Sequence, residues 1–121
     1  MLYLVKLGNV MLKRDILRRK DDFTSIYRRG KSVGERCVVL FYKKNSLGYN
    51  RFAFLASKKV GNSVERNRAR RLMKENFRFL RDNIRTGYDI IFIARNTING
   101  RKAQEVGKSM RNSLNKAKLY K

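Results

Sequence analysis

The sequence contains no histidine, proline or tryptophan, and it has one cysteine among its 121 residues. A single cysteine cannot form an internal disulfide, and a chain without histidine cannot build a Cys/His zinc site. Nucleophilic catalysis by a Ser–His or Cys–His pair is excluded for the same reason. We therefore predict no catalytic and no metal-ligating residue in this chain, and we expect Cys37 to be a buried small hydrophobe.

Long apolar runs are also missing. No stretch approaches the roughly 20 residues that a membrane span needs. Residues 2–5 are too short for the core of a signal peptide, and no small-residue cleavage site follows them. The chain is therefore expected to be cytoplasmic. Its hydrophobic content of 42% can still build a core, so the chain is not a disordered basic tail.

Acidic residues are few, whereas basic residues are abundant. There are 9 Asp and Glu against 31 Lys and Arg, which gives a net charge of +22. The like charges repel one another and destabilise the compact state unless a polyanion binds nearby. The expected partner is nucleic acid or an anionic membrane surface.

Residues 58–78 are the most informative segment, because a glycine turn there leads into a helix with two unlike faces. At helical spacing the apolar residues form one buried stripe: Ala69, Leu72, Met73, Phe77 and Leu80. The opposite side is a cationic ridge, formed by Asn67, Arg71, Lys74 and Arg78 and flanked by Arg66, Arg68 and Arg70. Acidic partners are scarce in this segment, so we expect phosphate contact rather than a solvated face.

The remaining pattern predicts a small α+β domain. Asp21 or Asp22 is expected to cap a short helix that contains Phe23, Ile26 and Tyr27 and stops before Gly30. Two strands, 37–42 and 51–57, are predicted to pair as a hairpin. Asn62 or Ser63 is expected to cap the long helix, which runs to about residue 83. The order is completed by an apolar strand at 88–94, which we expect to be covered on both faces, and by a helix from 103 to about 117.

The first ten residues carry little charge and no clear pattern. We expect residues 1–10 to be an extension outside the fold, with Met11 as a possible second start of translation. Residues 11–121 are predicted to form a single RNA-binding domain.

With these elements in place, the chain resembles the protein subunit of bacterial ribonuclease P. The resemblance is carried by the Ser-Lys-Lys-Val-Gly-Asn stretch at 57–62, by Arg66-Asn67-Arg68, and by the strand 88–95. Asp22-Phe23, Ile26-Tyr27 and Gly30 match upstream. The resemblance covers about residues 12–120 and departs from the family in residues 1–10.

The resemblance implies a fold and a function. The fold is an αβββαβα sandwich in which a small sheet is packed by helices, with a left-handed βαβ crossover around the Arg-Asn-Arg helix. Right-handed crossovers dominate in general, so the residues alone do not predict that hand. The implied function is to bind a catalytic RNA and the 5′ leader of precursor tRNA, so that the complex cuts off the leader. Mg²⁺ would be held mainly by the RNA, and no obligate protein partner is expected.

Two sets of site residues follow. The predicted RNA-binding residues are Lys58, Lys59, Asn62, Arg66, Asn67, Arg68, Arg70, Arg71, Lys74 and Arg78. Lys58 or Lys59 could instead face the cleft, and Asn67 could bond a base edge, a sugar or the backbone. The leader cleft implied by the resemblance is Phe23, Tyr27, Val39 and Phe41, although by pattern alone the three aromatic residues are core residues.

Other functions stay open on composition. A structural RNA-binding protein, such as a small basic ribosomal protein, has the same charge, and only the 58–78 motif favours ribonuclease P. The charge also allows a DNA-binding protein. A nuclease acting alone is disfavoured because histidine and paired carboxylates are absent.

Overall fold

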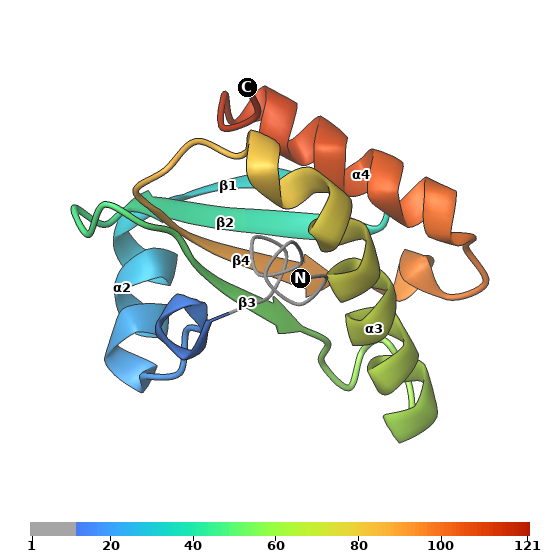
Figure 1. Cartoon of the computed structure of the whole chain (residues 1–121). Coiled ribbons are helices and arrows are strands. Elements are labelled where there is room, and N and C mark those ends of the chain that lie inside the picture. The colour runs from blue at the N-terminus through green and yellow to red at the C-terminus, as the bar shows by residue number, and fades with distance from the viewer. Residues whose placement is uncertain (1–11) are drawn as a thin grey trace, which may run out of the picture.

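The fold is built on one four-stranded sheet with helices on both faces (Figure 1). The computed structural model describes residues 12–121. Its strands and α-helices are α2 (Lys20–Arg29), β1 (Lys31–Gly34), β2 (Val38–Lys44), β3 (Arg51–Leu55), α3 (Ser63–Leu80), β4 (Tyr88–Ala94) and α4 (Ala103–Lys116). Short 3-10 turns stand at Lys13–Asp15 (η2), Arg81–Asn83 (η3) and Asn96–Ile98 (η4). The order αβββαβα is therefore confirmed for this part of the chain.

The strand order is β1-β2-β4-β3, so the predicted hairpin is wrong. Strand β4 lies between β2 and β3, antiparallel to the first and parallel to the second. The hairpin that does form joins β2 to β1, a strand that the sequence pattern missed. An almost continuously apolar strand such as β4 gains most from a central place, where both of its faces are buried. The hand of the β3–α3–β4 connection stays a prediction.

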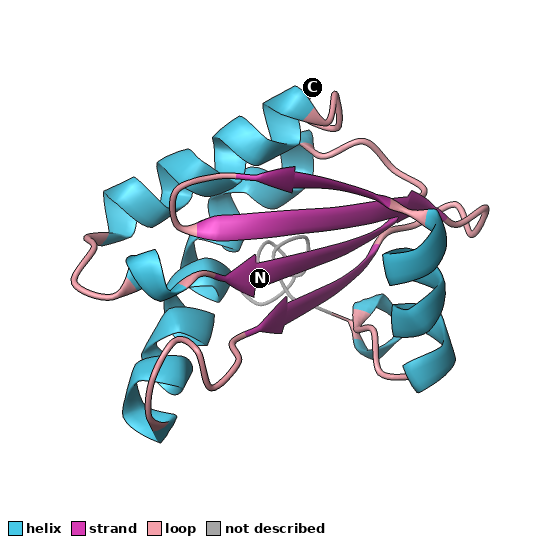
Figure 2. Cartoon of the chain, turned by 180° about the vertical axis from the view of Figure 1, so that it is seen from behind, coloured by secondary structure: helices cyan, strands magenta, loops and turns pink. Residues whose placement is uncertain are grey.

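Helices α3 and α4 cover one face of the sheet, and α2 covers part of the other (Figures 1 and 2). The larger core lies under α3 and α4 and includes Phe54, Phe77 and Phe92. A smaller cluster under α2 contains Leu17, Ile26, Ala53 and Ile91. The expected burial of β4 on both faces is confirmed, since its residues enter both clusters. Cys37 is fully buried, as expected for a small hydrophobe.

Helix α3 begins where the sequence predicted. The Asn62 side chain accepts from the Glu65 amide at 2.9 Å, and Glu65 accepts from the Asn62 amide at 3.0 Å. This reciprocal pair satisfies two amides at the start of the helix. Gly61 has a φ of 144°, and the Glu65 side chain occupies the place where a Cβ would stand. A glycine is therefore required there by the turn and the cap.

Helix α2 starts differently from the prediction that Asp21 or Asp22 caps it. Its N-cap is Arg19, which makes no side-chain cap, and both aspartates lie inside the first turn. Gly30 does follow the helix, but with a φ of −82°. A Cβ there would lie 2.5 Å from the Ile26 carbonyl oxygen and 2.6 Å from that of Tyr42. Close packing, rather than a left-handed backbone, explains this glycine.

Two expectations concern the limits of the domain. The proposed extension at residues 1–10 and the alternative start at Met11 lie outside the described residues. Among residues 12–121, no helix has the length and apolar character needed to cross a membrane.

Candidate RNA interface

The sheet face under α2 is organised in three rows that cross β2, β4 and β3. Strand alternation and register place Lys43, Asp89 and Arg51 in the first row, Phe41, Ile91 and Ala53 in the second, and Val39, Ile93 and Leu55 in the third. We call this surface the α2 face. The first row is charged and the other two are apolar.

Helix α2 covers the middle row through three side chains. Ile26 is fully buried there. The Tyr27 ring stands edge-on to Phe41, with centroids 5.1 Å apart, and the Phe23 ring is 6.4 Å from that of Tyr27. Tyr27 remains 43% exposed, so its ring is open to solvent on one side. Partial burial raises the pKa of its phenol above the ordinary value, because it disfavours the charged form.

The third row leads from the aromatic cluster toward the turn before α3. Its members Val39, Ile93 and Leu55 are all half-buried. Leu55 ends β3, and exposed Ser57, Lys58 and Lys59 follow it. The structure thus brings the predicted cleft residues Phe23, Tyr27, Val39 and Phe41 to one face. Sequence reasoning missed Leu55 and Ile93, although the two-residue period within each strand indicates their side of the sheet.

The cationic ridge of α3 contains two kinds of basic residue. Arg71, Lys74 and Arg78 are exposed, and within residues 12–121 their side chains have no hydrogen-bond or ion-pair partner. Their charges are therefore available to a polyanion.

The other arginines of this helix already bind the protein itself. Arg66 donates to the Gly61 carbonyl at 2.9 Å and to Ser63 Oγ at 3.2 Å. Arg68 donates to the Arg101 carbonyl at 2.8 Å. These two side chains hold the helix start and the segment before α4. Their predicted contact with RNA would use only their remaining N–H groups.

Four further polar residues of the predicted RNA set are either bonded to neighbouring groups of the protein or exposed to solvent. Asn67 is exposed and accepts from Arg70 Nη2, which selects neither a base nor a sugar as its target. Asn62 is engaged as the helix cap. Lys58 and Lys59 both stand exposed in the turn, and neither is singled out for the cleft.

A groove of about 740 Å³ joins the two predicted surfaces. One wall is the ridge of α3, with Arg70, Arg71, Lys74 and Arg78. The other includes Phe23 of α2 and Leu17 before it, over a floor formed by β3. Leu17 is tied to that strand by a 2.9 Å hydrogen bond from its amide to the Phe52 carbonyl. Cations and an aromatic ring therefore border the same hollow.

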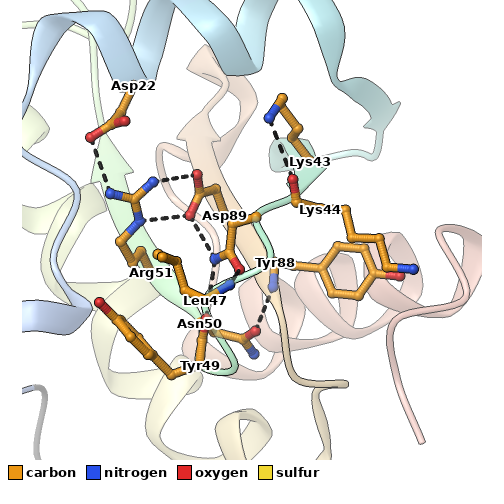
Figure 3. Close-up of polar contacts among 10 residues, drawn as sticks. Asp22, Lys43, Lys44, Leu47, Tyr49, Asn50, Arg51, Tyr88 and Asp89 are labelled. Carbon is orange, nitrogen blue, oxygen red and sulfur yellow. Dashed lines mark hydrogen bonds and ion pairs between the residues drawn. The ribbon is translucent and has the colours of Figure 1, made fainter.

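Asp89 has a structural role at the charged row (Figure 3). Its carboxylate accepts from Arg51 at 2.8 and 2.7 Å and from Asn45 at 2.9 Å, and its side chain is 5% exposed. The hydrogen bonds of Asp89 raise the pKa of Arg51 above its ordinary value. Within residues 12–121, no three His, Cys, Asp or Glu side chains gather where they could hold a metal ion.

Comparison with known proteins decides the family. The family model described as Ribonuclease P matches residues 11–118. The chain belongs to the ribonuclease P protein family. It is 44% identical over 110 residues to the ribonuclease P protein component of Clostridium botulinum (strain Langeland), covering 90% of this chain and 99% of that protein. The component of Thermoanaerobacter sp. (strain X514) is also 44% identical, over 111 residues, covering 90% and 96%.

Solved structures of ribonuclease P proteins have the same fold. The Staphylococcus aureus protein matches with a TM-score of 0.79 at 31% identity, covering 88% of this chain and 98% of that one. The Thermotoga maritima protein matches with a TM-score of 0.77 at 29% identity, covering 85% and 97%. This chain is accordingly a protein subunit of ribonuclease P, an endoribonuclease of tRNA processing whose chemistry is carried by RNA.

Proposed function

We propose that the two surfaces of this ribonuclease P protein divide the binding work. The cationic ridge of α3 binds the catalytic RNA, and the α2 face binds the single-stranded 5′ leader of precursor tRNA. Arg71, Lys74 and Arg78 neutralise phosphates of the RNA. Phe23, Tyr27 and Phe41, with the apolar third row beside them, offer unpaired bases a surface for stacking. The same proposal assigns the protein to the cytoplasm.

One observation carries the proposal: the groove that is bordered by both Phe23 and the unpartnered cations of α3. The cations on one wall suit the phosphates of the catalytic RNA, and the aromatic ring on the other wall suits the flat bases of a single strand. The adjacency also lets one protein contact the catalytic RNA and the substrate next to each other.

The chemistry is proposed to lie outside this chain. The protein has no histidine, and Asp22 and Asp89 are ion-paired to Arg51 rather than paired with each other. Among the described residues, no group of three or more His, Cys, Asp or Glu side chains could hold a metal ion. We propose that the magnesium ions belong to the RNA, and no step of the reaction is assigned to a side chain of this protein.

Reconstitution tests this function directly. The purified protein is added to a ribonuclease P RNA at a magnesium concentration too low for the RNA alone, and cleavage of precursor tRNA is followed. We expect the protein to restore cleavage at the mature 5′ end. Rigorously RNA-free protein serves as the control and should cleave nothing. Specific cleavage by the protein alone, or no stimulation of the RNA, would contradict the proposal.

A further inference from the structure

Arg51, the first residue of β3, links the sheet to the start of α2 (Figure 3). Its Nε and Nη2 atoms donate to the two carboxylate oxygens of Asp89, and Nη1 donates to Asp22 Oδ2 at 3.1 Å. The two parallel bonds to Asp89 fix the plane of the guanidinium. Arg51 is therefore held by the sheet in an orientation that aims its third nitrogen at α2.

Phe23, directly after Asp22, packs against the smaller core cluster, and the other contacts between α2 and the sheet lie further along the helix. Ile26 is buried at its middle, and Tyr27 packs edge-on against Phe41. Gly30 approaches the carbonyl of Tyr42 just beyond the C-terminal end. The contact between Asp22 and Arg51 is made at the opposite, N-terminal end of the helix. It is the one ion pair within residues 12–121 that involves a residue of α2.

We propose that Asp22 is a positioning residue for leader recognition: its contact with Arg51 sets the first turn of α2, and with it the ring of Phe23, against the α2 face and its groove. This inference rests on the proposed function of that face. Phe23 is the next residue in the chain and lines the groove. Without the contact, Ile26 and Gly30 still anchor the helix and Phe23 still packs on the smaller core cluster, but the first turn loses its ion pair, so α2 stays on the sheet while the position of that turn is less fixed.

The neighbouring Asp21 provides a matched control. Both aspartates lie in the first turn of α2, so replacing either one removes the same charge and the same interaction with the helix dipole. Asp21 is exposed, and within the described residues its side chain has no hydrogen-bond or ion-pair partner. Any general gain in RNA affinity from the lost negative charge appears equally in both variants, and the difference between them isolates the contact with Arg51.

The experiment uses the holoenzyme reconstituted with wild-type protein, Asp21→Ala, Asp22→Ala or Asp22→Asn. Dissociation constants are measured for precursor tRNA with a leader and for mature tRNA without one, and their ratio is the leader preference. Melting temperatures and the affinity for the catalytic RNA are measured on the same proteins. If Asp22→Ala is not folded at the assay temperature, Asp22→Asn takes its place in the comparison.

We expect Asp22→Ala to reduce the leader preference on the order of three- to tenfold, which is part of what one stacked base contributes. Asp22→Asn keeps an oxygen that can accept from Arg51, so its leader preference should lie between those of the wild type and Asp22→Ala. Asp21→Ala should keep the wild-type leader preference. Equal preferences in Asp21→Ala and Asp22→Ala, with a clear preference in the wild type, would overturn the positioning role and leave the proposed function standing. A wild-type holoenzyme without leader preference would overturn the proposed function of the α2 face, and this inference with it.

Discussion

Replacing Arg71 by Ala should change the salt dependence of RNA binding without changing stability. The Arg71 side chain is exposed and has no hydrogen-bond or ion-pair partner within residues 12–121, so its removal breaks no polar interaction of the described fold. If it neutralises one phosphate, the slope of log K against log salt falls by about 0.7 to 0.9. Between 50 and 200 mM salt, that slope difference corresponds to a change of about threefold in relative affinity.

The assay is a titration of the catalytic RNA at four or more salt concentrations, together with a thermal melt of each protein. Arg111→Ala is the matched control, because Arg111 is also an exposed helical arginine but lies on α4, away from the groove. We expect Arg111→Ala to keep the wild-type slope of log K against log salt. Arg68→Ala should behave differently from both: losing the 2.8 Å bond to the Arg101 carbonyl should cost about 0.5–1.5 kcal/mol of stability.

Two results would refute the reasoning. An unchanged slope in folded Arg71→Ala protein would mean that the ridge is an ordinary solvated surface. Equal reductions in Arg71→Ala and Arg111→Ala would mean that phosphate contact is spread over the protein and is not concentrated on α3.

Three further predictions concern the cleft and the helix ends. Tyr27→Ala should weaken the binding of leader-bearing tRNA by about 1–3 kcal/mol, because one base stack is lost, and should barely affect leaderless tRNA. Tyr27→Phe keeps the ring and should keep the affinity, whereas equal losses for both tRNAs in Tyr27→Ala would show a packing role. Asn62→Ala should lower the free energy of unfolding by about 1 kcal/mol through loss of the cap, as measured by denaturant titration, and no loss would show that the cap is dispensable. The hydrogen bond from the Lys102 amide, and after it the one from Arg101, lowers the pKa of Glu105, so the ionised Glu105 side chain stabilises the fold above the ordinary glutamate pKa and this contribution is lost as the pH falls. The difference in melting temperature between wild type and Glu105→Gln should therefore disappear on acidification, and a difference that stays constant with pH would contradict this.

The features that the sequence determined by itself are local or compositional. The stripe of α3 is a periodic pattern, and Ala69, Met73 and Phe77 are buried as their spacing predicted. The pairing of Asn62 with Glu65 involves residues three apart, so it could be read directly. The absence of histidine excluded whole classes of catalysis before any fold was considered. The cationic ridge followed from the same local pattern.

The tertiary structure alone decided everything that depends on which strands meet. Strand β4 enters between β2 and β3, although it follows them by more than thirty residues, and no local signal opposes the simpler hairpin. Strand β1 is short, edge-placed and mostly exposed, so it lacks the apolar alternation that marks a strand. The sequence also could not show which arginines of α3 lack a hydrogen-bond partner within the described protein, because the partner of Arg68 lies 33 residues further along the chain.

The α2 face combines both sources of information. Strand alternation alone puts Val39 and Phe41 on one side of their strand, but only the register across β4 and β3 adds Ile93 and Leu55 to the same row. Asp21 or Asp22 was expected to cap a helix, whereas Asp22 forms an ion pair with an arginine 29 residues away. Local sequence determines the character of each element, because propensity and periodicity act over a few residues. The site is decided by long-range pairing, because its residues become neighbours only when the sheet has formed.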